Sequence, residues 1–463
     1  MAKEYLIGDF LKRIKRPIQL IDDQEYKLVT IKMNHNGVVL REHKKGALIK
    51  SKMYEVKKGD FILSGIDARN GAFGIVPPEL DGAIVTNDFW YFKIDENIIS
   101  KRLFLELTAT TWFDEICTRG SDGTTQRIRL QKNKFFNQSV MLPEGNEQKV
   151  LLDKILSFKI GQSKLDSEIQ TQKLLTTQLK QSILQEAIQG KLTADWRAKR
   201  ALSGAEVEPV SELLKRIKAE KAQLIKDKKI KKEKPLPPIT AADIPFEIPD
   251  GWVWCRLGEI IVNADNLDIQ KKLSPDDIIN YVDIDAVDNK KQVVREAKKL
   301  PVRELSSRAR RVLKKGHILY SLVRPYLHNL AIVNEDKPNL IGSTGFAVFD
   351  CIRVENKYIF WLLLSKYIED VYLDFMDGFN SPSITHDQFK STIIPVPPLK
   401  EQKVIVEKVE LLMQKYQALE QEIKTSEANA EMLMQAVLKE AFLPAESSDK
   451  AGAGKQEVVV VCK

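Results

Sequence analysis

The sequence has few of the residues that build metal centres and disulfide frameworks. Its four cysteines include no CxxC pair, which argues against a zinc ribbon and a disulfide scaffold; they are Cys117, Cys255, Cys351 and Cys462. Its five histidines are equally dispersed, without an HxxxH pair. No apolar run approaches the ~18 residues of a membrane span, and the N-terminal Met-Ala-Lys-Glu lacks the apolar segment of a signal peptide. We therefore expect a cytoplasmic protein with no contact to a membrane.

Phosphate and cofactor loops are missing too. Residues 453–456, Ala-Gly-Lys-Gln, end like a phosphate loop but lack its upstream glycine, and Gln456 stands where Ser or Thr would hold magnesium. Asn87-Asp88-Phe89-Trp90 lacks the paired prolines of amino-methyltransferases. Pro275-Asp276 with Asp288-Asn289-Lys290 superficially fits a metal-dependent nuclease, but it has no partner in the repeat described below. We expect no catalytic residue, no metal and no cofactor in this chain.

What is present is an ordinary composition with a basic balance. Of 463 residues, 43% are hydrophobic and 29% are charged, which suits a protein of several domains with real cores. The net charge of +8 suggests a polyanionic partner without identifying one.

The chain also repeats itself over a very long interval. Lys57-Lys58-Gly59-Asp60-Phe61-Ile62-Leu63-Ser64 returns as Lys314-Lys315-Gly316-His317-Ile318-Leu319-Tyr320-Ser321, a shift of 257 residues. Glu147-Gln148-Lys149-Val150 returns as Glu401-Gln402-Lys403-Val404, a shift of 254. Solenoid units run roughly 20–50 residues, so this interval is a whole domain plus an attached segment. It predicts two similar surfaces related by an internal pseudo-two-fold.

The hydrophobic patterns predict an α+β fold for each copy. Short β-branched and aromatic runs separated by turn residues favour curved sheets, and a helical stretch follows in each copy near 103–113 and 358–373. The predicted order is a first domain at 1–145, a long helical region at 146–195, a connector at 196–245, a second domain at 246–396, a second helical region at 397–445 and a disordered tail at 446–463.

The two helical regions predict an antiparallel coiled coil. In the first, apolar residues fall at heptad positions: Leu151, Ile155, Phe158, Leu165, Ile169, Leu179 and Ile183. The second has Ile405, Val409, Leu412, Tyr416, Leu419, Ile423, Leu433 and Val437. Both stripes weaken at matched places, at Gln172 and Thr176 and at Ser426 and Ala430, which suggests that the helices face each other. One short stripe of this kind would indicate only a core helix.

The connector is rich in lysine. Its basic run extends from Lys215 to Lys234 and ends at Pro235-Leu236-Pro237-Pro238. Two interpretations stay open: a solvated helix and linker, or non-specific contact with phosphate.

Loops of different sequence interrupt the shared framework at corresponding places. DNA reading uses Arg for guanine, Asn or Gln for adenine, and small polar or basic side chains for phosphate. The candidates in the first copy are Arg69, Asn70, Arg119, Ser121, Thr124, Thr125, Gln126, Arg127 and Arg129. Those in the second copy are Arg308, Arg310, Arg311, Arg324, Tyr326, His328, Asn329, Asn380, Ser381, Ser383 and His386. A single arginine of this kind is usually a solvated surface residue, so the prediction depends on the recurring pattern.

In the order of these features the chain resembles specificity subunits of type I restriction-modification systems. The resemblance covers the chain up to its tail and includes Gly190-Lys191-Leu192-Thr193-Ala194-Asp195-Trp196-Arg197 and Ile244-Pro245-Phe246-Glu247-Ile248-Pro249-Asp250-Gly251-Trp252. It implies two target-recognition domains, each reading one half of a split double-stranded DNA target. It also implies two modification subunits, which hold S-adenosylmethionine, and restriction subunits that use ATP and Mg. The two long helices would set the gap between the half-sites and dock these partners.

Two other classes of protein remain as alternatives. A free-standing DNA methyltransferase would bind S-adenosylmethionine by itself, and a coiled-coil scaffold without a DNA role would show no sequence preference.

Overall fold

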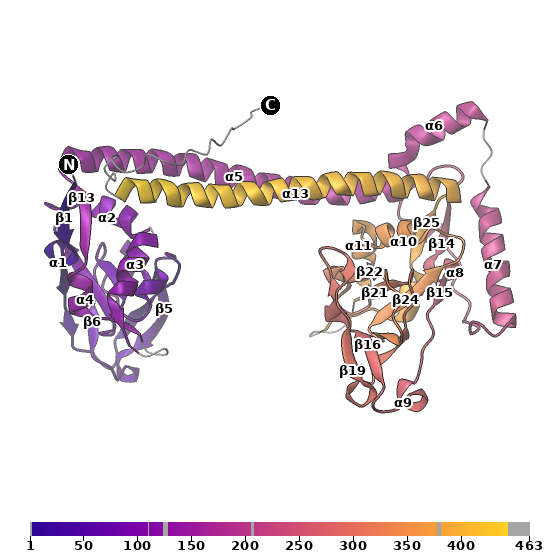
Figure 1. Ribbon diagram of the computed structural model, residues 1–463, viewed down its shortest axis with the longest axis horizontal. Helices are drawn as coiled ribbons and strands as arrows, with labels where there is room; N and C mark the ends of the chain where they lie inside the picture. Colours follow the sequence, from indigo (N-terminus) through magenta and orange to yellow (C-terminus); the bar gives the residue numbers. More distant parts are fainter. Residues whose placement is uncertain (1, 110, 124–127, 205–207, 377–380, 443–463) are drawn as a thin grey trace, which may run out of the picture. The chain divides into compact units, whose positions relative to one another are not determined.

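The computed structural model describes residues 2–109, 111–123, 128–204, 208–376 and 381–442 (Figure 1). The predicted tail at 446–463 lies outside these residues. The chain divides into two compact units, Met1–Thr171 with Ile423–Lys463, and Gln172–Glu422. Each unit contains one of the two repeated domains together with part of each long helix.

The first domain is built on two sheets. In the described residues, an antiparallel four-stranded sheet has the order β2 (Leu11–Ile14), β10 (Phe89–Ile94), β7 (Phe61–Ser64) and β8 (Phe73–Ile75). A five-stranded sheet has the order β3 (Pro17–Ile18), β6 (Met53–Glu55), β9 (Ile84–Val85), β4 (Glu25–Ile31) and β5 (Val38–Lys45), with β4 and β9 parallel. Two further pairs are β1 (Ala2–Leu6) with β13 (Ser139–Pro143) and β11 (Ser121–Asp122) with β12 (Arg129–Leu130).

The second domain has a similar arrangement of strands, except that its second sheet has four described strands rather than five. Its antiparallel sheet has the order β15 (Ile261–Asn263), β24 (Phe346–Cys351), β21 (Ile318–Ser321) and β22 (Leu330–Ile332). The other sheet has the order β19 (Lys298–Pro301), β16 (Ile278–Val282), β23 (Leu340–Ser343) and β20 (Ala309–Val312), again with one parallel pair. Two smaller pairs are β14 (Val253–Arg256) with β25 (Ile393–Val396) and β17 (Val287–Asp288) with β18 (Val293–Val294). The repeated topology confirms that the chain contains two similar domains.

Corresponding hydrogen bonds explain why the Lys-Lys-Gly segment recurs. Gly59 and Gly316 both have a positive φ, +81° and +93°, which glycine adopts without steric cost. Each donates its backbone N–H to a carbonyl just after the next strand but one: Gly59 to Val76 O after β8, and Gly316 to Val333 O after β22, both at 2.8 Å. The repeated sequence thus encodes one turn that starts the central strand of each domain.

Short helices pack against the sheets of each domain. They are α1 (Ile7–Phe10), α2 (Lys101–Thr108), α3 (Thr111–Arg119) and α4 (Lys132–Phe136) in the first domain, and α8 (Leu257–Ile260), α9 (Ile269–Lys272), α10 (Asn356–Leu363), α11 (Lys366–Phe375) and α12 (His386–Ser391) in the second. The stretches predicted at 103–113 and 358–373 are each two helices. In the second domain a new helix begins because the Ser365 side chain caps it, accepting from the N–H of Ile368.

Aromatic residues fill the core between sheet and helices. In the first domain the ring of Phe61 on β7 meets that of Phe104 on α2 edge to face, at 4.9 Å between centroids. In the second domain Tyr320 on β21 contacts Tyr372 of α11 and Phe389 of α12 at 5.6 and 5.4 Å. These rings are buried, so the sheets are held by apolar burial on their helical side.

Each domain leads into a long helix, α5 (Asn146–Ile188) or α13 (Leu399–Phe442). Within the first unit the two run antiparallel: Gln162 bonds the carbonyl of Ala430, and Ile169 packs with Ile423. Within the second unit Lys180 lies over the ring of Tyr416. No helix in the described part of the chain has the length and hydropathy that a bilayer-spanning segment requires.

The seam, meaning the buried contact surface between the two helices, is narrower than the a/d surface of a heptad coiled coil. A heptad stripe has two core positions, a and d. In α5 only one of these two positions is consistently covered by the partner helix, since Leu165 and Leu179 remain 39% and 43% exposed. Thr176 and Ala430, two of the matched small or polar places, are only 5% and 4% exposed, as expected if the helices face each other. Small side chains allow backbones to approach closely. The a/d stripe was wrong at Leu165 and Leu179, which were predicted as core positions.

The repeated glutamine fixes the start of each long helix. Gln148 bonds three backbone groups of the first domain, namely the carbonyls of Ile98 (2.6 Å) and Pro143 (2.9 Å) and the N–H of Ser100 (3.1 Å). Gln402 does the same in the second domain, donating to Pro397 O and accepting from Glu355 N, both at 2.8 Å. Both amide ends of the side chain are used, so the helix start is tied to the domain that precedes it.

The first half of the connector contains two helices, α6 (Ala194–Ser203) and α7 (Val210–Lys226). It is joined to α13 through Glu401, whose buried carboxylate accepts from Thr193 Oγ1 (2.7 Å), Trp252 Nε1 (3.0 Å) and Arg197 Nη1. Three charged or polar donors around one carboxylate satisfy a charge that would otherwise be costly to bury.

We predict that Glu401→Gln weakens this junction, because it removes the charge that balances the half-buried Arg197. The expected loss is about 3 kcal/mol. Hydrogen exchange of the peptide that covers α6 measures it as a loss of protection of about two orders of magnitude. Glu407→Gln, an exposed position on the same helix, is the matched control. Equal protection in the two variants would contradict a supporting role for Glu401.

Candidate nucleic-acid interface

The loops expected to read DNA leave the framework at equivalent points. In the first domain Gly65, after β7, donates to Asp88 O (2.7 Å) and accepts from Leu130 N (2.7 Å). In the second domain Leu322, after β21, donates to Gly345 O (2.9 Å) and accepts from Ile384 N (2.9 Å). The structure thereby places the two predicted loops of each domain side by side.

In the second domain this pairing brings together residues that are far apart in sequence. Val323 forms a β-bridge with Ser383, and the N–H of Arg324 donates to Pro382 O at 2.8 Å. Arg324 has a positive φ of 48° just before the 3-10 helix η8 (Pro325–Leu327), and it is exposed to solvent. An arginine on a rigid, bonded turn has less freedom to lose on binding than one on a free loop.

Arg311 and His386 meet from β20 and α12. Arg311 Nη2 lies 2.7 Å from His386 Nε2. Burial lowers the pKa of His386 to about 4, with a further contribution from the charge of Arg311, and burial also lowers the pKa of Arg311. His386 is thus neutral near pH 7 and accepts from the guanidinium, which keeps its charge.

The other candidates of the second domain have varied surroundings. Burial lowers the pKa of His328, which pairs with Glu369 at 3.3 Å, and Arg310 Nε donates to Ser307 O at 2.9 Å. The carbonyls of Arg308 and Asn329 accept backbone bonds from Thr344 and Ser321. Tyr326 and Ser381 are exposed, and Asn380 lies outside the described residues. Several side chains expected to face DNA therefore already have partners within the protein.

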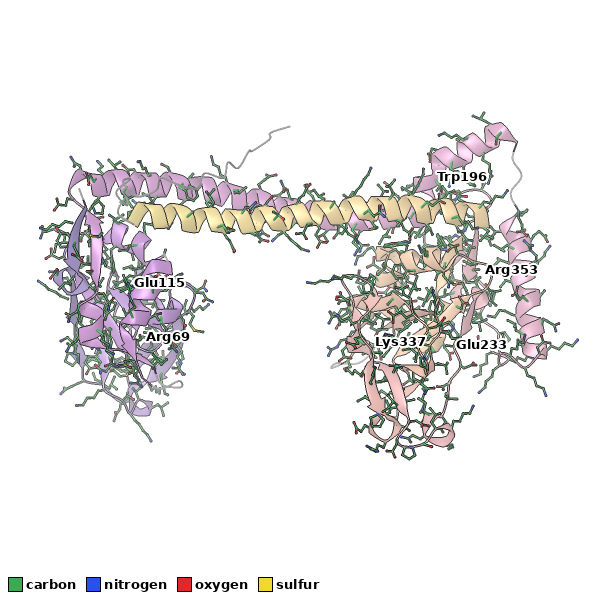
Figure 2. All side chains as sticks on the ribbon, viewed as in Figure 1. Arg69, Glu115, Trp196, Glu233, Lys337 and Arg353 are labelled. Atoms are coloured by element: carbon green, nitrogen blue, oxygen red, sulfur yellow. The ribbon has the colours of Figure 1, made fainter. Side chains whose placement is uncertain are left out.

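The first domain shows a similar mixture. Arg119 Nε donates to Gln138 Oε1 (3.2 Å), Ser121 Oγ donates to Cys117 O (2.7 Å), and Arg129 pairs with Asp88 (2.9 Å). Arg69 and Asn70 belong to the 3-10 helix η2 (Ala68–Asn70), which packs beside α3; Figure 2 labels Arg69 and Glu115 on these two elements. The predictions for Thr124, Thr125, Gln126 and Arg127 fall outside the described residues.

One basic residue at this surface was not predicted. Arg13, on β2, stacks its guanidinium 4.4 Å from the ring centroid of Trp90 and donates to Asn87 O at 3.0 Å. Burial lowers its pKa. Its partner Asn87 directly precedes Asp88, the partner of Arg129, but the separation of 74 positions between Arg13 and Asn87 leaves no local sequence signal for this contact.

Metal-binding clusters of His, Cys, Asp and Glu are absent from the residues that the structure describes. Burial raises the pKa of the thiols of Cys117 and Cys255, so they stay protonated. In the nuclease-like pattern, Asp276 forms an ion pair with Arg303, and Asp288 accepts from the N–H groups of Lys290 and Lys291. These carboxylates have local structural partners.

The chain belongs to the family of the type I restriction modification DNA specificity domain, whose model matches residues 3–175 and 249–426. The two matches correspond to the two repeated domains with the adjoining part of each helix.

Among curated relatives, the chain is 34% identical over 258 residues to the type I restriction enzyme EcoAI specificity subunit of Escherichia coli, covering 54% of this chain and 41% of that protein. It is 24% identical over 382 residues to the EcoDI specificity subunit of Escherichia coli, covering 81% of this chain and 76% of that protein. The chain thus spans about two fifths of the length of the first of these relatives.

Solved structures share the fold. An HsdS subunit from Thermoanaerobacter tengcongensis superposes with a TM-score of 0.52 at 17% identity, covering 95% of this chain and 96% of the other. A chain from a structural study of complex assembly and conformational transition of the type I R-M system gives a TM-score of 0.59 at 17% identity, covering 95% and 97%.

We predict that Arg324→Ala weakens binding to the specific duplex by about 1–3 kcal/mol while binding to random duplex changes little, as expected for a base contact. Titration of the two duplexes at one salt concentration checks this. Arg353→Ala is the matched control, since Arg353, labelled in Figure 2, also has a positive φ (53°) and is not one of the loop candidates; it pairs with Glu220 of α7. A loss of equal size on both duplexes would identify Arg324 as a phosphate contact.

Proposed function

We propose that this chain is the DNA-recognition subunit of a type I restriction-modification complex. Each repeated domain reads one half of a bipartite, asymmetric target in double-stranded DNA. The observation that supports this most is that corresponding hydrogen bonds hold the framework of both domains while the loops at Gly65 and Leu322 differ in sequence. Two readers on one scaffold can then recognise different bases.

The base-reading side chains in this proposal are the exposed members of the loops. Arg324, Tyr326 and Ser381 are open to solvent in the second domain, as are Asn70 and Arg119 in the first. Arg311 and His386 form a half-buried pair that presents a fixed charge at the same surface. Phosphate contacts position such a surface, and base contacts give it specificity.

The partners in this proposal are two modification subunits, which bind S-adenosylmethionine and methylate adenine, and restriction subunits, which use ATP and Mg. The chain itself would catalyse no reaction and would act in the cytoplasm. The narrow seam of the helices supports docking, since it leaves large apolar side chains exposed: Ile160, Leu174, Leu175, Leu411 and Met432. Exposed apolar residues on a long helix are a usual feature of protein contact sites.

Co-expression with the modification subunit, followed by mapping of methylated adenines, tests this function. The expected result is a split target with two specified halves. A sequence-independent pattern, or methylation by the isolated chain in the presence of S-adenosylmethionine, would instead support the scaffold or the free-standing methyltransferase.

We further propose that the long helices set the gap between the half-sites. The 43 residues of α5 measure roughly 65 Å at about 1.5 Å per residue, close to two turns of duplex at about 34 Å each. Inserting four residues between Thr171 and Thr176, with four more after Leu419 on the antiparallel partner, should lengthen the gap by roughly two base pairs at about 3.4 Å each.

The methylation map of this insertion variant measures the gap. A variant with four substitutions at the same sites and no added length serves as the control. An unchanged gap in the insertion variant would refute the role of the helices as a ruler.

A further inference from the structure

The connector follows a fixed path along the second domain. Val210, Leu213 and Ile217 of α7 are buried in the same core cluster as Leu257 and Ile260 of α8. One face of this lysine-rich helix is therefore packed, which a solvated linker would not require. Its spacing of apolar residues is that of an amphipathic helix.

Polar contacts hold the connector along its length. Lys221 Nζ donates to Gly258 O (2.7 Å) and Ile261 O (2.9 Å), and burial lowers its pKa. Further along, Glu233 pairs with Lys390 at 2.9 Å, and Arg256 donates to the carbonyl of Pro237 at 2.6 Å. Figure 2 labels Glu233 beside the second domain. The basic segment between these anchors is thus held next to α8, β15 and α12.

A cavity of about 1120 Å³ opens between the connector and the second domain. Its lining, which we call the connector cavity, contains eight lysines and Arg311 against only three carboxylates, Glu233, Glu259 and Asp265. Glu233 is already paired with Lys390. The cavity therefore carries a strong excess of positive charge, which fits a polyanion.

Arg311 and His386 link this cavity to the candidate DNA interface. Both line the connector cavity, and both belong to the set of residues expected to face DNA. Their 2.7 Å contact joins β20 to α12, and α12 begins directly after the loop whose Pro382 and Ser383 contact Arg324 and Val323.

We infer that the lysines of the connector cavity contact the phosphates of the duplex whose half-site the second domain reads. Duplex DNA carries one charge per about 1.7 Å of its axis, and lysine binds phosphate as a point charge that reports no sequence. The inference rests on the proposed function. It adds a role for the connector, whose lysines line a cavity against the second domain.

Two double variants of the full chain, assembled with its modification subunits, test the inference. Lys229→Gln with Lys231→Gln removes two lysines of the connector cavity. Lys226→Gln with Lys232→Gln removes two equally exposed lysines of the same segment that do not line it. Affinity for a duplex carrying the mapped target is measured between 50 and 200 mM salt, conditions in which phosphate contacts dominate the salt dependence.

The expected result for the cavity variant is a slope of log K against log salt that falls in magnitude by about 2, since each phosphate contact contributes about 0.9. Affinity near 100 mM salt should fall by about tenfold or more, equally on target and random duplex, while the methylated sequence stays the same. The control variant should change the slope by less than about 0.5.

Three outcomes would overturn the inference. Equal slopes for the two variants would mean that only net charge matters. An unchanged slope in the cavity variant would exclude phosphate contact. Loss of assembly with the modification subunits at an unchanged slope would assign the cavity to an acidic protein partner. Failure of the proposed function is distinguishable, because the unaltered chain would then show no preferred target.

Discussion

The structure depends on one recurring contact, the glutamine that ties each long helix to the domain before it. Gln148 and Gln402 each use both ends of their amide on backbone groups, and Gln402 is fully buried. A domain that only adjoined its helix through an unconstrained turn could rotate about it. With this amide in place, the reading loops of a domain keep a defined orientation to the start of their own helix.

Within the domains, too, the same contacts recur in both copies. The turns at Gly59 and Gly316, and the strand ends at Gly65 and Leu322, make corresponding hydrogen bonds. Because these bonds use backbone groups, they place few demands on side chains in the adjoining loops. The loops can therefore differ in sequence while the sheets and helices stay the same, which is the property that a pair of sequence readers needs.

Much of this architecture could be predicted from the sequence because it depends on local patterns and on the repeat. The repeat predicted the two similar domains, the short apolar runs predicted their α+β content, and the heptad spacing predicted the paired long helices. The seam between the helices was predicted in part: Thr176 and Ala430 are buried, as the matched weak places suggested, whereas the predicted core residues Leu165 and Leu179 are 39% and 43% exposed. Heptad counting cannot tell which of two apolar positions a close approach of helices will cover.

The site was harder to predict because its contacts are not local. Arg13 reaches Asn87 and Arg311 reaches His386 across 74 and 75 residues, and neither pair has a characteristic spacing. In the connector, the spacing of Val210, Leu213 and Ile217 indicates the buried face of α7. The many lysines around these residues made a solvated helix the more obvious interpretation. The positive net charge of the chain suggested a polyanionic partner. The fold was needed to show which lysines lie close together around one cavity.

The most direct measurement of the central claim, that two modules on one framework each read half of a target, is a domain exchange. Residues 1–145 would be replaced by the corresponding domain of a relative with a different target, leaving Gln148 and the rest of the chain unchanged. Mapping of methylated adenines should then show a change in one half of the target, with the other half retained. A change in both halves would contradict the account.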